Sequence, residues 1–145
     1  MITKVFFDTN VILDAFTRRD YSFKPSLELI RFIIDKKIDG YICIKQITDI
    51  YYILRKYVDN ISTQKNVIKD IIDIFKILPL LKSDITASLY NGIADFEDAV
   101  LEEVARTNTM NYLVTNDISH FRDSKMVVVT PTQLLELIEL TIETN

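Results

Sequence analysis

The chain has little of several residue types, and each shortage narrows what it can be. A single cysteine, Cys43, excludes an internal disulfide and a zinc site built from cysteines. Cys43 lies in the apolar stretch 41–44, which predicts a small buried side chain. No hydrophobic run approaches the ~18 residues that a membrane-spanning helix needs, and the N-terminus lacks the features of a signal peptide. We therefore expect a cytoplasmic protein without a membrane segment.

The chain has few glycines and prolines and a small net negative charge, as expected of a compact protein. Two glycines and three prolines leave little material for flexible linkers, so we expect residues 1–145 to form one domain. The formal net charge is −4, so the chain is not a basic nucleic-acid-binding protein of the usual electrostatic kind. Binding of a polyanion would need metal ions that reverse the local charge.

Hydrophobic patterning predicts strands and helices that alternate along the chain. The predicted strands are Lys4–Phe7, Tyr41–Ile44, Ile77–Leu81, Tyr112–Thr115 and Met126–Thr130. The predicted helices are 11–17, 25–37, 46–58, 63–75 (capped by Ser62), 85–90, 95–107 and 131–142, before a frayed tail at 143–145. Pro79 places the third strand near a sheet edge. This alternation is typical of an α/β fold, a three-layer α/β/α sandwich with a mostly parallel sheet.

The first predicted strand ends in Asp8-Thr9-Asn10, an acid followed by a hydroxyl and an amide. The carboxyl ends of strands are where open α/β sheets bind ligands. We expect Thr9 and Asn10 to hydrogen-bond the Asp8 carboxylate and hold it in one rotamer, as a metal ligand requires. The alternative is that Asp8 caps the next helix, although Asn10 could do this instead. Asp14, within that helix, either supports the site or is exposed.

The fourth predicted strand ends in the same chemistry, in Thr115-Asn116-Asp117. One such ending is common in turns, but two parallel strands that end in acids side by side indicate a site. Thr115 and Asn116 are expected to support it, as Thr9 and Asn10 do at the first strand. His120, which is the only histidine, is interpreted as a loop or surface residue rather than a catalytic base.

Two further acids lie on predicted helices, and each has a structural alternative. Asp49, placed in the first turn of its helix, could simply complement the helix dipole. Asp95 could cap the helix that contains Asp98, with Asp98 reaching back in a variant capping box. The same helix could instead present a solvated face with a Glu102–Arg106 ion pair. An acidic cluster without grouped histidine or cysteine favours Mg²⁺ or Mn²⁺ over zinc.

The order of these motifs resembles the PIN domain, and in particular the single-domain bacterial kind that includes VapC-type toxins. The resemblance covers essentially the whole chain. It rests on the motif Asp8-Thr9-Asn10, on an acid in a central helix, on the motif Asp95-Phe96-Glu97-Asp98-Ala99, and on Thr115-Asn116-Asp117 followed by Phe121. It implies a metal-dependent ribonuclease whose acids match Asp8, Asp49, Asp98 and Asp117. Asp49 stands where Glu is more common, and Asn116 stands where many members carry Arg.

The resemblance leads to a mechanistic hypothesis, hydrolysis of an RNA phosphodiester bond by a metal-activated water. Asp8, Asp98 and Asp117 would bind Mg²⁺ or Mn²⁺, and Asp49 would bind a metal or orient the water. The candidate phosphate contacts are Arg18, Arg19 and Lys24 in the loop 18–24, with Lys45 and Lys56; the alternative is that they are ordinary surface charges.

A second hypothesis is a PIN-like binding module with weak or no nuclease activity. One predicted helix carries more apolar residues around its circumference than a single stripe facing the core requires, namely Tyr51, Tyr52, Ile53 and Tyr57. This surface could bind a second copy in a homodimer or an antitoxin peptide. An antitoxin partner is a further expectation, because the resemblance includes toxins. A phosphoacceptor aspartate of the receiver type is weaker, because Pro131 follows the last strand where a lysine would be needed.

Overall fold

A five-stranded sheet, parallel throughout, forms the centre of the molecule in the computed structural model, which describes residues 2–19 and 23–144. The strand order is β3-β2-β1-β4-β5. The strands are β1 (Thr3–Phe7), β2 (Ile38–Cys43), β3 (Lys76–Leu78), β4 (Tyr112–Val114) and β5 (Val128–Val129). Strand β3 is an edge strand, which confirms the expectation drawn from Pro79.

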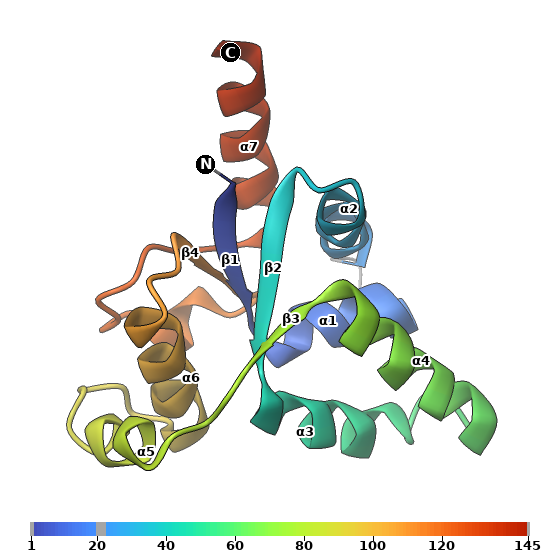
Figure 1. Ribbon diagram of the computed structural model, residues 1–145, viewed down its shortest axis with the longest axis horizontal. Helices are drawn as coiled ribbons and strands as arrows, with labels where there is room; N and C mark the ends of the chain where they lie inside the picture. The colour runs from blue at the N-terminus through green and yellow to red at the C-terminus, as the bar shows by residue number, and fades with distance from the viewer. Residues whose placement is uncertain (1, 20–22, 145) are drawn as a thin grey trace.

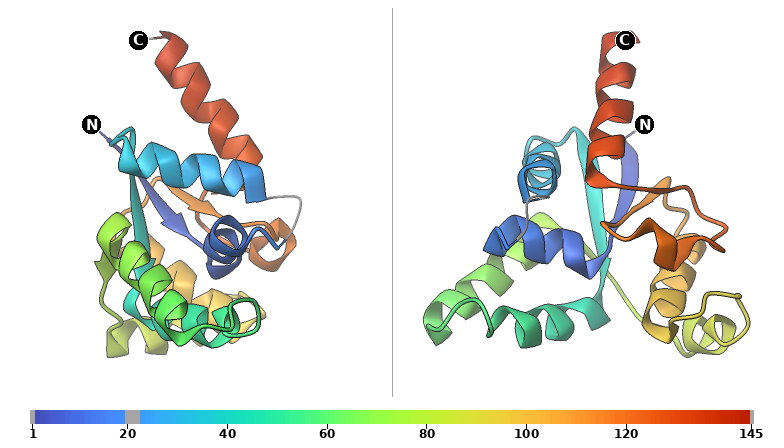
Figure 2. Two further views of the ribbon diagram at one scale, coloured as in Figure 1. Left: turned by 90° about the vertical axis from the view of Figure 1, so that its right-hand side faces the viewer. Right: turned by 180° about the vertical axis from the view of Figure 1, so that it is seen from behind.

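Helices cover both faces of this sheet, so the predicted three-layer sandwich is confirmed (Figure 1). The helices are α1 (Thr9–Thr17), α2 (Phe23–Ile34), α3 (Ile44–Leu54), α4 (Ile61–Ile74), α5 (Lys82–Ser88), α6 (Phe96–Thr107) and α7 (Pro131–Thr144), with a 3₁₀ helix, η1, at Ile118–Phe121. Helices α5 and α6 lie on one side and α1, α2, α3 and α4 on the other, and two views show α3 and α4 projecting together away from the sheet (Figure 2).

The alternation of side chains along β1 builds a core on each face of the sheet. Val5 and Phe7 pack with residues of α1, α2 and α7 on one face, whereas Phe6 packs with residues of α6 and η1 on the other. All three side chains are fully buried. Because successive strand residues point to opposite faces, a short apolar run places β1 at the centre of both cores.

Glycine and proline mark two boundaries that the sequence placed wrongly. We expected Gly40 to precede the second strand, but β2 begins at Ile38 and contains it. A Cβ at Gly40 would collide with the side chain of Ile33, so α2 can pack directly on the strand there. Helix α2 begins at Phe23, before Pro25, because proline is tolerated within a first turn.

Other predicted boundaries shift by a few residues. Asn60, not Ser62, caps α4, because its Oδ1 accepts a hydrogen bond of 3.1 Å from the Thr63 amide. Helix α3 spans Ile44–Leu54 rather than 46–58, and α7 continues through Thr144, so the predicted frayed tail is wrong for 143 and 144; Asn145 lies outside the described residues. The short helix η1 was not predicted.

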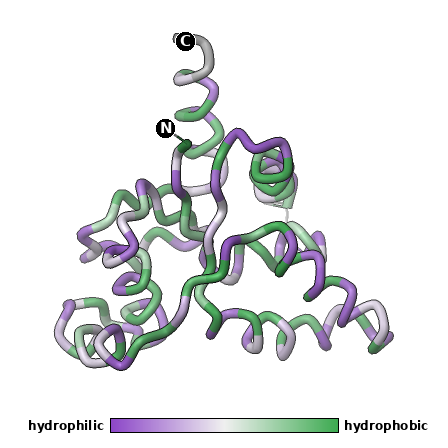
Figure 3. The backbone as a smooth tube through the Cα atoms, viewed as in Figure 1, coloured by the Kyte–Doolittle hydropathy of each residue, from purple (hydrophilic) through white to green (hydrophobic). Residues whose placement is uncertain are grey.

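Hydrophobic and hydrophilic residues alternate along the helices that flank the sheet (Figure 3). Within residues 2–19 and 23–144, no helix is both long and apolar enough to cross a membrane. Cys43 is fully buried at the end of β2, as predicted.

Gln46 fastens the start of α3 to the end of β1. Its side chain is fully buried, its Oε1 accepts from the Cys43 amide at 2.7 Å, and its Nε2 donates to the Phe7 carbonyl at 2.8 Å. Helix α3 is therefore positioned by polar contacts as well as by packing.

We expect Gln46→Met to lower the free energy of unfolding by about 2 kcal/mol, because the two buried backbone groups lose their partners. Chemical denaturation measures this change. Gln133→Met is the matched control, since Gln133 makes a similar capping bond to Thr130 on the exposed start of α7; its loss should be about 1 kcal/mol or less. Equal losses in both variants would contradict this account of Gln46.

Candidate metal-binding active site

The carboxyl ends of β1 and β4 meet where the strand order reverses direction. From β1 the chain proceeds to β2 and β3 on one side, and it later returns to β4 on the other. The Asp8 amide donates to the Val114 carbonyl at 3.0 Å, which joins the two strand ends directly. Open α/β sheets bind ligands at such a reversal point, and the predicted Asp8 and Asp117 motifs both lie at this edge.

Asp8 is 7% exposed and held by three donors. The Thr9 amide donates to its Oδ1 at 2.8 Å, while the Asn10 side chain (3.3 Å) and the Thr115 hydroxyl (2.7 Å) donate to its Oδ2. The expectation that Thr9 and Asn10 hold this carboxylate is confirmed. Asp8 is also the residue that caps α1, so Asn10 does not replace it as the cap.

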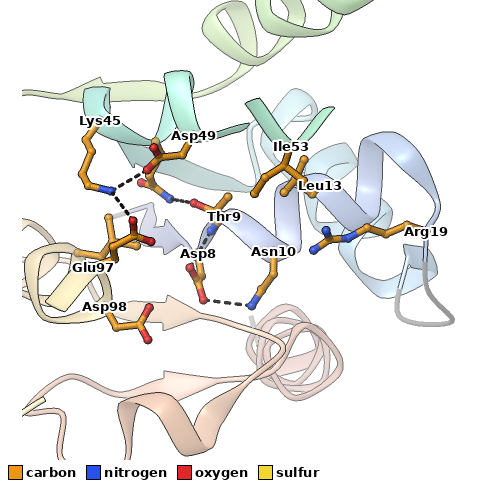
Figure 4. Close-up of a pocket in the computed structure, with 12 residues that line it drawn as sticks. Asp8, Thr9, Asn10, Leu13, Arg19, Lys45, Asp49, Ile53, Glu97 and Asp98 are labelled. Carbon is orange, nitrogen blue, oxygen red and sulfur yellow. Dashed lines mark hydrogen bonds and ion pairs between the residues drawn. The ribbon is translucent and has the colours of Figure 1, made fainter. Parts of the chain in front are cut away.

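Asp98 enters the site from the first turn of α6. Asp95 caps this helix by accepting from the Asp98 amide at 3.0 Å, as the capping alternative predicted, but the Asp98 side chain lines the cleft instead of completing a capping box. Figure 4 shows the Asp98 carboxylate turned toward Asp8 across an open cleft, lined also by Lys45, Asp49 and other residues of α1, α3 and α6. Two carboxylates from separate elements therefore face one space.

Burial and mutual repulsion raise the pKa of both carboxylates. For Asp8 the main cause is burial, which raises its pKa above the ordinary value although the hydrogen bonds from Thr115 and Thr9 oppose this. For Asp98, burial first, and then the negative charges of Asp8 and Asp95, raise the pKa to about 7. A carboxylate pair that resists joint ionisation is stabilised by a cation.

Asp117 lies beside His120, a residue that the sequence reading had left outside the site. His120 is exposed, as predicted, but its Nε2 lies 3.0 Å from the Asp117 carboxylate and its Nδ1 lies 3.5 Å from Asp98. Ser119 also donates to Asp117 at 2.7 Å. Residues three apart eclipse in a 3₁₀ turn, so a prediction of η1 would have placed His120 next to Asp117.

Asp49 lies in the second turn of α3 rather than the first, so the alternative in which it complements the helix dipole does not apply. Its carboxylate is 39% exposed and bonds to Lys45 at 2.6 Å. The same Lys45 ammonium lies 3.9 Å from Glu97 of α6, so it bridges the two sides of the cleft (Figure 4). A side-chain cation thus already neutralises the fourth predicted acid, unlike Asp98.

Asp14 supports the site and is not exposed, which decides between the two alternatives. It is 3% exposed, it accepts from Arg19 Nε at 2.7 Å, and it accepts a hydrogen bond from the Asn116 side chain. The Asn116 amide in turn donates to Asn10 at 3.2 Å. Asn116 therefore ties the two strand-end motifs together.

The alternative of a solvated face on α6 with a Glu102–Arg106 ion pair is wrong. Glu102 is 1% exposed and accepts from the Lys125 amide at 2.8 Å and from the Ser124 hydroxyl. Arg106 pairs with Glu103 at 2.7 Å instead of Glu102. Glu102 therefore anchors the segment before β5, a role that helical spacing alone could not reveal.

The predicted substrate contacts occupy different places. Arg19 lines the cleft, and Arg18 does not; its guanidinium lies over the Phe23 ring at 5.6 Å. Lys45 lines the cleft, Lys56 lies over the ring of Tyr52, and Lys24 is exposed on α2.

The facing carboxylates of Asp8 and Asp98 fit a hard divalent cation. Asp8 and Asp98 offer carboxylate oxygens in a partly desolvated cleft, and Asp117 follows the neighbouring strand, which is the chemistry that Mg²⁺ and Mn²⁺ prefer. In the part of the chain that the structure describes, no three acidic, histidine or cysteine side chains stand together as a ready-made metal site.

Comparison with known proteins assigns the family. Residues 4–119 match the profile of the family described as the PIN domain, so this chain belongs to the PIN-domain family, as its motifs predicted. It is 29% identical to Ribonuclease VapC1 of Aquifex aeolicus (strain VF5) over 132 residues. The matched region covers 88% of this chain and 90% of that relative.

Solved structures share the fold at low sequence identity. VapBC2 from Rickettsia felis, bound to a DNA fragment from its promoter, aligns with a TM-score of 0.67 and 16% identity over 90% of this chain and 98% of the other. VapC20 of Mycobacterium tuberculosis, described as a sarcin-ricin loop cleaving toxin, aligns with a TM-score of 0.65 and 10% identity over 81% of this chain and 93% of the other. At these identities the likeness is one of fold.

Asp98 should destabilise the metal-free protein at high pH. Because its pKa rises from 3.8 to about 7 on folding, its protonated form stabilises the fold; this contribution is complete below pH 3.8 and is lost as the pH rises through 7. In chelator-treated protein, we expect Asp98→Asn to be more stable than wild type at pH 8 by about 1–2 kcal/mol, with no such gain near pH 4. Denaturation across pH measures this.

Asp123→Asn is the control for this measurement, because Asp123 is an exposed acid after η1. It should show little dependence of the stability difference on pH. An Asp98→Asn protein that is less stable than wild type at pH 8 would contradict the assigned origin of the raised pKa.

Proposed function

We propose that this protein is a ribonuclease that hydrolyses RNA phosphodiester bonds with Mg²⁺ or Mn²⁺, and that it is the toxin of a toxin–antitoxin pair. The observation that carries the proposal is the facing pair of Asp8 and Asp98, two carboxylates with raised pKa in one cleft. The family assignment and the relative named as a ribonuclease support the same reaction.

The proposed metal ligands are Asp8, Asp98 and Asp117. When a divalent ion is bound, the chemistry it supplies is a water of lowered pKa and positive charge against the developing charge of the phosphoryl oxygens. Thr9, Asn10 and Thr115 hold the Asp8 carboxylate, and His120 and Ser119 hold that of Asp117. These contacts fix the directions of the ligand oxygens before RNA arrives.

Asp49 and Lys45 act on the nucleophile side of this site. Lys45 holds Oδ2 of Asp49 at 2.6 Å, and Oδ1 would then accept a hydrogen bond from the attacking water. Lys45 also faces the cleft, where its ammonium can contact a phosphate oxygen.

Binding partners follow from the relatives. A toxin–antitoxin complex from Klebsiella pneumoniae that shares this fold favours an antitoxin for this chain. A homodimer stays a prediction; Leu81 and Leu89, which flank α5, and Phe96 at the start of α6 are exposed and offer it an apolar surface.

The decisive experiment is cleavage of structured and single-stranded RNAs by purified protein with Mn²⁺ or Mg²⁺. We expect cleavage that a chelator abolishes, and a loss of about 100-fold or more in Asp8→Asn and Asp98→Asn, because each removes a charge that binds the metal. Asp70→Asn, an exposed acid on α4, is the control and should cleave as wild type does. Full activity of Asp8→Asn would sink the assignment.

The toxin role makes a separate prediction in cells. Expression of the wild-type chain should arrest growth, and Asp98→Asn should not, since the arrest requires RNA cleavage. Growth curves of matched expression strains measure this, with co-expression of a small DNA-binding protein encoded next to the gene as the rescue. Arrest by both proteins would favour the binding module without catalysis.

A further inference from the structure

The end of α3 carries a cluster of aromatic and basic side chains, which we call the aromatic–basic patch: Tyr52, Arg55, Lys56 and Tyr57, with Arg19 from the end of α1. Tyr52 is 60% exposed and Tyr57 is 51% exposed. The Arg55 guanidinium lies 4.7 Å and the Lys56 ammonium 5.7 Å from the Tyr52 ring, and Arg19 lies 5.8 Å from the Tyr57 ring.

This patch continues the active-site cleft. Arg19 lines the cleft with one side and contacts Tyr57 with the other, and Ile53, between the two tyrosines in sequence, also lines the cleft (Figure 4). Lys45, Asp49 and Tyr52 are spaced by four and three residues and so lie on one face of α3. Cleft and patch therefore form one continuous surface.

The core does not account for these side chains. Of the four residues expected to give α3 surplus apolar circumference, Ile53 packs against the core and the Tyr51 hydroxyl donates to Gln64 of α4 at 3.1 Å. Tyr52 and Tyr57 are the two that remain half exposed or more, and both have cations at their rings. The exposed surface is thus less apolar than the sequence suggested.

The charges and the aromatic rings of the patch indicate which kind of ligand binds there. Three cations gather here on a chain whose net charge is −4. Arg19 is already paired with Asp14, but a purely apolar partner would also have to bury the charges of Arg55 and Lys56, which is costly. An unpaired nucleotide offers a phosphate to the cations and a base to an aromatic face, which is how proteins bind single-stranded RNA.

We propose that the aromatic–basic patch is a subsite for an unpaired nucleotide of the RNA substrate, next to the bond that is cleaved. The inference rests on the proposed ribonuclease function. From Asp49 to Tyr52 the rise along α3 is about 5 Å, so a strand whose phosphate lies in the cleft can reach Tyr52. The enzyme would then favour RNA that is single-stranded at this position.

Tyrosine variants test the subsite through the kinetics of cleavage of a short single-stranded RNA with Mn²⁺. We expect Tyr52→Leu and Tyr57→Leu to raise KM about tenfold, with kcat nearly unchanged, because stacking on the ring is lost. Tyr52→Phe and Tyr57→Phe should behave as wild type, since phenylalanine keeps the ring. Tyr90→Leu is the matched control, because Tyr90 is 83% exposed and lies far along the chain, after α5.

Lysine variants supply an independent readout. Lys56→Ala should weaken RNA binding and reduce its dependence on salt concentration, because one phosphate contact is lost. Lys65→Ala, an exposed lysine on α4, should change neither. Thermal melting of each variant confirms that it is folded.

The outcomes separate this inference from the proposed function. If wild type cleaves RNA and the leucine variants have the KM of Tyr90→Leu, the subsite is wrong and the ribonuclease stands. If the leucine variants instead lose self-association or antitoxin binding with KM unchanged, the patch is a protein interface and the inference is overturned. If wild type neither binds nor cleaves any RNA with Mn²⁺ or Mg²⁺, both proposals fail.

Discussion

The hydrogen bond from the Thr115 hydroxyl to the buried Asp8 carboxylate is the contact on which the site depends. It joins the ends of β1 and β4, residues 107 positions apart in sequence, at the point where the sheet reverses its strand order. The same hydroxyl accepts from the Asp117 amide at 3.0 Å. One side chain thus orients two of the proposed metal ligands, so the geometry of the site is inseparable from the parallel pairing of the two strands.

The acids around this contact differ in how their charge is balanced. Asp14, Asp49 and Asp117 each have a basic side chain within 3.0 Å, whereas the pKa of Asp98 rises because burial and neighbouring acids outweigh His120. The facing carboxylates of Asp8 and Asp98 have no basic side chain that close among the described residues, so their negative charges repel each other. In the proposed ribonuclease, a divalent cation would relieve that repulsion, and the neutralised cleft would then accept a phosphate of RNA beside Lys45 and Arg19.

Much of the architecture could be predicted, because it rests on local patterns. Apolar runs identified each strand, helical periodicity identified the seven α-helices, and the repeated strand endings identified Asp8 and Asp117. Boundaries were less certain, since the cap of α4 and the inclusion of Gly40 in β2 depend on neighbouring elements. The 3₁₀ turn that brings His120 to Asp117 has no strong local signature, so its role was missed.

The sequence by itself determined the residue types at each strand end, the alternation that yields a parallel sandwich, and the family. Only the tertiary structure decided which charges meet: that Lys45 spans Asp49 and Glu97, that Arg19 holds Asp14, and that Glu102 binds the segment before β5. The reason is physical. Local patterns follow from the period of a strand or helix, whereas a charge pair between distant elements exists only after packing has set their separation and removed water between them.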